Sequence, residues 1–152
     1  CIRDRVISEL GNLNLLGIPW FIITNQPGVA KGRIEMRDVM NTFSQIQGLL
    51  SEKGVFFDDF RFCPHHPEGG WEGEVPELKL TCSCRKPSPD MVLSLKSEHG
   101  LDLNKSWIIG DSLVDEQLAI GLGCSFIGIS SDDSEALADA IRRAASEILD
   151  AS

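Results

Sequence analysis

The sequence lacks an excess of positive charge. Lys and Arg together number 14 against 23 Asp and Glu, so the formal net charge is −9 at pH 7 and the pI is near 4.7. Nucleic-acid-binding surfaces hold phosphate backbones with clustered Lys and Arg. We therefore expect no nucleic-acid partner. A small anionic substrate stays possible, because four cations could set the potential of a pocket: Lys31, Arg33, Arg85 and Lys86.

Long apolar runs are also lacking. Gly, Pro or a charged residue interrupts each apolar stretch before the roughly 20 residues that a membrane-spanning helix requires. No membrane partner is therefore expected. Repeats and low-complexity tracts are absent too. With 42% hydrophobic residues among 152, the chain has enough apolar surface for one core. We predict a single domain over residues 1–152, and we expect a monomer.

Cysteine is scarce outside one cluster, and the count of five is odd, so a disulfide scaffold is not expected. Three of the five, Cys63, Cys82 and Cys84, fall near His65 in a pattern typical of metal ligands. Cys124 lies in an apolar run and is expected in the core. This cysteine usage favours a reducing, cytoplasmic setting.

The pairs Cys63-x-His65 and Cys82-x-Cys84 supply three thiolates and one imidazole. This set suits tetrahedral zinc, and a site in which protein fills all four positions is structural. We therefore predict a zinc-binding loop over residues 63–84 that the metal braces against the sheet. The alternative is a redox pair at Cys82 and Cys84, with Cys63 as a lone buried thiol.

The spacing of the apolar residues predicts alternating helices and strands. Five segments have helical periodicity, and four short apolar runs are typical of strands buried on both faces. Such alternation indicates an α/β fold with a Rossmann-like parallel sheet and helices on both faces. Residues 64–84 have no clear period, which indicates a functional or metal-held loop. Helices are expected at 3–16, 35–53, 88–99 with Ser88 as N-cap, 113–122 and 133–149, and strands at 20–23, 55–63, 106–110 and 125–129.

Three polar signatures fall where such a sheet binds its ligands, beyond the carboxyl ends of the strands. A hydroxyl, an ammonium and a carboxylate there could hold a phosphoryl oxygen, neutralise its charge and bind magnesium. Taken singly, Thr24 would be a turn residue, Lys86 a surface charge and Asp111 a helix cap. Their joint occurrence indicates phosphoryl transfer. The signatures are Thr24-Asn25-Gln26, Arg85-Lys86-Pro87, and Gly110-Asp111 with Asp115.

From about residue 10 to residue 129, these motifs and the Cys/His cluster resemble the haloacid dehalogenase (HAD) phosphatases. The similar branch contains histidinol-phosphate phosphatases and D-glycero-D-manno-heptose bisphosphate phosphatases and carries a zinc loop. The resemblance implies that Thr24 hydrogen-bonds the transferring phosphoryl group, Lys86 stabilises its charge and Asp111 ligates magnesium. It also implies that Asp115 supports the site. Substrate contacts are expected from Thr24, Asn25, Gln26, Arg85 and Lys86.

The chain departs from the family at its amino end. The family's nucleophile lies in an Asp-x-Asp-Gly motif on the first strand, and this chain has none. The nearest imitation, residues 1–5, would place Ile2 at the nucleophile position, so we interpret its charges as helix surface. An initiator Met and an apolar signal core are also missing. We therefore expect an amino-terminally incomplete domain that lacks its central first strand. Ser112 also replaces a commonly basic residue.

The resemblance implies a magnesium-dependent phosphatase that acts through an aspartyl-phosphate, with the nucleophile absent from this chain. The expected substrate is D-glycero-beta-D-manno-heptose 1,7-bisphosphate, which would lose its 7-phosphate. Histidinol phosphate is the alternative. From another class, a catalytically inactive HAD-like binding or scaffold domain would keep the fold and the zinc. Upstream sequence separates these readings, because an Asp-x-Asp-Gly segment there favours the enzyme. The 152 residues alone are expected to have little or no activity.

Overall fold

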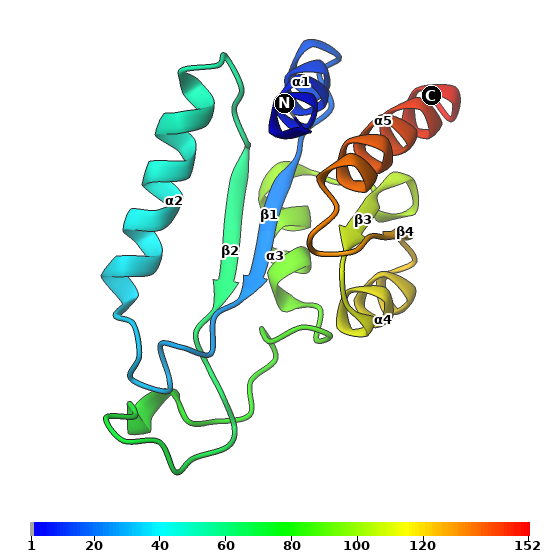
Figure 1. Cartoon of the computed structure of the whole chain (residues 1–152). Coiled ribbons are helices and arrows are strands. Elements are labelled where there is room, and N and C mark those ends of the chain that lie inside the picture. Colours follow the sequence, from blue (N-terminus) through cyan, green and yellow to red (C-terminus); the bar gives the residue numbers. More distant parts are fainter. Residues whose placement is uncertain (1) are drawn as a thin grey trace.

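Helices and strands alternate along the chain, as the apolar periodicity predicts (Figure 1). This computed structural model describes residues 2–152, with side chains from residue 4 onward. The strands are β1 (Phe21–Asn25), β2 (Asp59–Cys63), β3 (Trp107–Gly110) and β4 (Ser125–Gly128). The helices are α1 (Ile2–Leu15), α2 (Met36–Ser51), α3 (Asp90–His99), α4 (Leu113–Leu122) and α5 (Ser134–Asp150), with short 3₁₀ turns η1 (Pro76–Leu78) and η2 (Leu103–Lys105).

Two predicted boundaries were wrong. Ser88 does not cap α3, because its N–H bonds the Arg85 carbonyl at 2.8 Å in a turn and the helix begins at Asp90. The strand predicted from residue 55 begins at Asp59 instead. Val55 still closes the end of α2 by donating to the Leu50 carbonyl at 3.0 Å. These differences follow from backbone hydrogen bonds in local turns, which the spacing of apolar residues does not reveal.

The strands form two separate parallel pairs. β1 pairs with β2, from Phe21 opposite Asp59 to Asn25 opposite Cys63. β3 pairs with β4, from Trp107 opposite Ser125 to Gly110 opposite Gly128. The parallel α/β class is thus confirmed. Among residues 2–152, no strand joins β1 to β3.

Apolar side chains from both halves meet in one cluster beneath α1 and α5. Leu13 of α1 packs with Ile141 and Ala145 of α5, and Trp20 and Ile109 pack against this cluster. Because Trp20 precedes β1 and Ile109 lies in β3, the α1–α5 cluster connects the two strand pairs.

A second core lies between α2 and the β1–β2 pair (Figure 1). Val39 and Phe43 of α2 are buried there, and Phe43 stacks on Phe60 with ring centroids 4.0 Å apart. No helix in the described part of the chain is long and apolar enough to cross a membrane.

Candidate active site and metal centre

Lys86 and Asp115 form a buried ion pair beyond the strand ends. The ammonium of Lys86 donates to Asp115 Oδ1 at 2.6 Å, and the two side chains are only 13% and 7% exposed. Ser112, the N-cap of α4, donates from its hydroxyl to Asp115 Oδ2 at 2.7 Å and accepts from the Asp115 N–H at 3.3 Å. Both carboxylate oxygens of Asp115 are therefore occupied.

Glycine at the end of β3 makes this arrangement possible. A Cβ at Gly110 would lie 2.5 Å from the Cβ of Asp115. Only the absence of a side chain at Gly110 lets the first turn of α4 approach the strand end so closely.

Asn25, at the end of β1, holds the backbone of Lys86 from the other side. Its Oδ1 accepts from the Lys86 N–H at 3.0 Å, and its Nδ2 donates to the Lys86 carbonyl at 3.3 Å. Both polar atoms of the side-chain amide are thus bonded to Lys86. The carboxyl ends of β1 and β3 therefore meet at this lysine, one through Asn25 and the other through Asp115.

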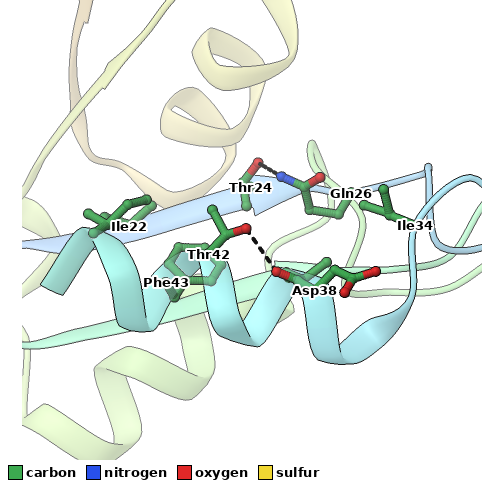
Figure 2. Close-up of a pocket in the computed structure, with 9 residues that line it drawn as sticks. Ile22, Thr24, Gln26, Ile34, Asp38, Thr42 and Phe43 are labelled. Atoms are coloured by element: carbon green, nitrogen blue, oxygen red, sulfur yellow. Dashed lines mark hydrogen bonds between the residues drawn. The ribbon is translucent and has the colours of Figure 1, made fainter. Parts of the chain in front are cut away.

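Thr24 and Gln26 lie on the other side of β1, in a pocket of about 290 Å³ against α2 (Figure 2). Gln26 donates to the Thr24 hydroxyl at 3.3 Å, and that hydroxyl donates to the Asn25 carbonyl at 3.4 Å. Successive strand side chains point to opposite faces, so Thr24 shares a face with Ile22 while Asn25 turns to Lys86. No hydrogen bond within the described residues joins Thr24 to Lys86.

Asp111 follows β3 directly and is exposed to solvent. In the described part of the chain its carboxylate has no hydrogen-bond or ion-pair partner. The resemblance implied magnesium binding by Asp111 and a supporting role for Asp115, and it is Asp115 that bonds Lys86 and Ser112. The spacing from Ser112 to Asp115 is that of a helix cap, and this signal could have identified the buried acid.

The charged pair shifts the titration of Asp115. Burial by itself raises the pKa of this carboxyl group, but the hydrogen bonds from Lys86 and Ser112 outweigh burial and hold the pKa below its ordinary value. Asp115 is therefore an anion at neutral pH, and it neutralises Lys86.

The four predicted metal-ligand side chains converge. Their ligand atoms all lie within 4.8 Å of one another. Cys84 Sγ lies 3.2 Å from Cys63 Sγ, 3.4 Å from Cys82 Sγ and 3.2 Å from His65 Nδ1. Tetrahedral zinc with Zn–S bonds near 2.3 Å would hold its sulfur ligands about 3.8 Å apart. The donor set and its compactness fit such an ion.

The thiols have unequal pKa values. Burial is the main cause that raises the pKa of Cys84, and the neighbouring Cys63 and Cys82 raise it further. Burial also raises the pKa of Cys63. Burial opposes ionisation of Cys82 as well, but hydrogen bonds from Cys84 and Cys63 outweigh it and lower the Cys82 pKa.

The Cys/His loop is tied to the strand ends and to the turn after β1. Arg85 donates to the His65 carbonyl at 3.2 Å, next to Lys86 in the sequence. The Lys31 ammonium lies 4.3 Å from the centre of the Trp71 ring, while Arg33 is exposed. The contact between Lys31 and Trp71 was not predicted, because it joins segments forty residues apart.

Comparisons with known proteins agree with this architecture. A HAD-hydrolase-like family model matches residues 83–150. A D-glycero-beta-D-manno-heptose-1,7-bisphosphate 7-phosphatase from Rhodopseudomonas palustris is 35% identical over 128 residues, which cover 84% of this chain and 69% of the relative. The enzyme of that name from Yersinia pestis is 35% identical over 117 residues, which cover 77% of this chain. The chain spans 60% of the length of the Yersinia pestis relative.

Solved structures show the same fold. A HAD-like phosphatase from Mesorhizobium loti superposes with a TM-score of 0.79 at 26% identity over 95% of this chain and 74% of its own. A D,D-heptose 1,7-bisphosphate phosphatase from B. bronchiseptica, complexed with magnesium and phosphate, gives a TM-score of 0.71 at 23% identity. That alignment covers 90% of this chain and 81% of the other, and it concerns the fold alone.

The parallel α/β fold is that of the HAD-like hydrolases. Within that class, the chain belongs to the family of the D-glycero-beta-D-manno-heptose-1,7-bisphosphate 7-phosphatases.

Proposed function

We propose that this chain forms the greater part of a magnesium-dependent phosphatase that removes the 7-phosphate of D-glycero-beta-D-manno-heptose 1,7-bisphosphate. The observation that carries the proposal is the buried Lys86, held between two strand ends by Asn25 and Asp115. The exposed Asp111 directly follows β3, one of these two strands. A fixed ammonium and a free carboxylate at the same edge of the sheet suit a phosphoryl group and its divalent cation. The names of the relatives support the sugar bisphosphate as substrate.

In this proposal Lys86 stabilises the charge on the transferring phosphoryl group, and Asp111 ligates magnesium. Bound magnesium would act as a Lewis acid on the phosphoryl oxygens. For Thr24 to donate its hydroxyl to the same phosphoryl group, its side chain must turn out of the α2 pocket and give up its bond to the Asn25 carbonyl. Arg85, with Gln26, contributes to substrate binding.

Asn25 was predicted to contact the substrate, and its bonds in the structure support a different role. Because both ends of its side-chain amide are bonded to the backbone of Lys86, we propose that it positions this lysine. Asp115 positions the Lys86 ammonium from the end of β3. When phosphate binds, the ammonium is shared between Asp115 and the phosphoryl group.

We also infer that the nucleophilic aspartate comes from outside these 152 residues. It would attack the phosphoryl group to give an aspartyl-phosphate that water then hydrolyses. Zinc held by Cys63, His65, Cys82 and Cys84 would brace the 63–84 loop next to Arg85 and Lys86. A single-domain, cytoplasmic monomer completes the proposal, since the reduced thiols required for zinc binding suit that compartment.

The catalytic proposal is tested by phosphate release. The 152-residue chain is compared with the same chain extended at its amino end by an Asp-x-Asp-Gly strand. Heptose bisphosphate and histidinol phosphate are the two substrates. We expect release from the bisphosphate by the extended chain. Asp111→Asn should lower kcat by about 10²-fold or more, while Glu147→Gln, an exposed acid on α5, leaves it unchanged.

Three outcomes contradict the catalytic proposal. Equal activity of Asp111→Asn and the unmodified extended chain would remove the magnesium role. Preference for histidinol phosphate would reassign the substrate. A folded extended chain that binds phosphate but releases none from either compound would favour the inactive binding domain.

The zinc proposal is tested by metal analysis of purified protein. We expect one zinc per chain, and less than a tenth of that after Cys84→Ser, with faster amide hydrogen exchange confined to residues 64–84. Cys124→Ser is the matched control, because Cys124 is a free thiol outside the cluster. Fewer than one zinc in untreated protein, or equal loss in the control, would count against the assignment.

A further inference from the structure

The segment that leads from the Cys/His loop into α3 is closed at its ends by two hydrogen bonds. Ser83 lies between Cys82 and Cys84, and its hydroxyl donates to the carboxylate of Asp90 in the first turn of α3. The Asp90 N–H donates back to the Ser83 carbonyl at 3.4 Å. Residues 83–90 therefore form a loop whose two ends are joined, which we call the 83–90 loop.

Lys86 lies inside the 83–90 loop. An inner turn spans this lysine, because the Ser88 N–H donates to the Arg85 carbonyl at 2.8 Å. Asn25 bonds the N–H and the carbonyl of Lys86 from the end of β1. The backbone of the lysine is therefore held by β1 on one side and by the closed loop on the other.

The contact made by Asp90 goes beyond what α3 itself requires. An acid in the first turn of a helix is favourable through the helix dipole alone, and no side chain caps α3. Asp90 additionally accepts a hydrogen bond from outside its helix, and hydrogen bonds to an ionised acceptor are stronger than those between neutral groups. Joining the ends of so short a loop restricts the backbone of every residue within it.

We propose that Asp90 is a positioning residue that acts through Ser83 to fix Lys86 for the reaction proposed above. Without this contact, the ends of the 83–90 loop separate and the Lys86 ammonium moves away from Asp115. Asp90 needs no contact with the substrate for this role. The reactive role of Lys86 rests on the proposed function, whereas its position can be measured without turnover.

The first test measures the exposure of Lys86 in the 152-residue chain. Acetic anhydride labels accessible lysine amines, and peptide mass spectrometry reads each lysine separately. The Lys86 side chain is only 13% exposed, so it should be labelled more slowly than the exposed Lys105. Asp90→Ala should raise the Lys86 rate about fivefold, within the factor of roughly 2 to 12 that one net hydrogen bond represents. The Lys105 rate should stay unchanged.

Three further variants separate this contact from a general effect on α3. Ser83→Ala removes the same hydrogen bond from its other end. It should raise the Lys86 rate as much as Asp90→Ala, and the double variant should raise it no further. Asp90→Asn keeps an acceptor oxygen and should stay within twofold of wild type. Ser88→Ala is the matched control, because the Ser88 hydroxyl has no hydrogen bond among the described residues, and it should change nothing.

The second test follows turnover in the extended chain. Asp90→Ala should lower kcat about fivefold and change KM less than twofold, because a displaced ammonium stabilises the transition state less well. Asp90→Asn should keep at least half of the wild-type kcat.

Three outcomes would overturn the positioning role. The first is unchanged Lys86 labelling in Asp90→Ala. The second is faster zinc release to a chelator without faster labelling, which would assign the contact to the metal-binding turn alone. The third is faster labelling with unchanged kcat. An unmodified extended chain without turnover would contradict the proposed function, and labelling would then decide by itself whether Asp90 positions Lys86.

Discussion

At the scale of single residues, the candidate site is organised around one lysine. Lys86 has its backbone fixed by Asn25 and its ammonium fixed by Asp115. A buried pair of this kind adds little net stability relative to an apolar pair, but removing one partner leaves an uncompensated charge. The main effect of this ion pair is therefore to fix the position of the Lys86 ammonium where the ends of β1 and β3 meet.

Replacing Asp115 should destabilise the fold. Asp115→Asn is expected to lower the free energy of unfolding by about 2–4 kcal/mol at pH 7, since Lys86 loses its buried counter-charge. Asp111→Asn, an exposed acid four residues away, should change it by less than about 0.5 kcal/mol. Urea denaturation measures both. Equal effects of the two substitutions would show that the ion pair contributes nothing specific.

The pH dependence of Asp115→Asn has a defined sign. The folded-state pKa of Asp115 lies below its ordinary value near 3.8, so the carboxylate stabilises the fold above that value and the contribution disappears as pH falls below it. The difference between wild type and Asp115→Asn should therefore shrink below about pH 4. A difference that grows on acidification would contradict the assignment.

Asp59, which is not part of the Lys86 site, should give a second pH-dependent contribution to stability. The hydrogen bond from His99 is the largest cause that lowers its pKa to about 2, Arg61 lowers it further, and burial opposes both. Asp59→Asn should cost about 1 kcal/mol above pH 4, after allowance for solvent screening, and the cost should vanish as pH falls to about 2. Denaturation from pH 7 to pH 2 measures this, and a pH-independent cost would refute it.

At the scale of elements, two loops cross beyond the strand ends. Ala30 donates to the Pro64 carbonyl at 3.2 Å, and Val75 donates to the Ala30 carbonyl at 2.9 Å. Where they cross, Gly32 has a positive φ of 68°, and a Cβ there would lie 1.7 Å from the Gly73 carbonyl oxygen. The turn after β1 thus holds the Cys/His loop by backbone contact.

Gly32→Ala should separate the two loops. The substitution adds a backbone clash to left-handed strain, and we expect a loss of about 2–4 kcal/mol. Gly73→Ala is the matched control, because Gly73 has a similar φ of 77° but open space at its Cβ position. Its cost should be about 1 kcal/mol. Hydrogen exchange at residues 64–84 checks both variants, and equal exchange would refute the contact.

At the scale of the whole molecule, α1 and α5 connect the β1–β2 pair to the β3–β4 pair. The α1–α5 cluster contains side chains adjacent to both strand pairs, while β1 and β3 share no ladder. The stability of each half should therefore depend on α1 and α5. Figure 1 shows α1 and α5 side by side above the strands.

Truncating the connecting cluster should loosen both halves together. Leu13 is 8% exposed and belongs to the cluster against which Trp20 and Ile109 pack, so Leu13→Ala is expected to cost about 2–4 kcal/mol. Leu15 in the same helix is 87% exposed, and Leu15→Ala should cost less than about 0.5 kcal/mol. Hydrogen exchange of β1 and β3 should accelerate by the same factor in Leu13→Ala. Acceleration in one strand alone would show that the halves unfold independently.

The order of helices and strands, the α/β class and the four Cys/His positions could be predicted from the sequence. The apolar period of Leu113–Leu122 and the closing Gly123 are local signals, and the predicted helix there has the observed bounds. The same holds for Cys63, His65, Cys82 and Cys84, whose residue types limit the chemistry they can perform.

Only the tertiary structure decided which way the site residues face and what they touch. Thr24 and Asn25 are neighbours in the sequence, yet the pleat of β1 sends one to the α2 pocket and the other to Lys86. The choice of Asp115 over Asp111 as partner of Lys86 depends on how α4 sits against Gly110. The sequence by itself therefore determined the local elements and the available chemical groups. Their pairing arises from packing between segments far apart in the chain, which a local pattern does not encode.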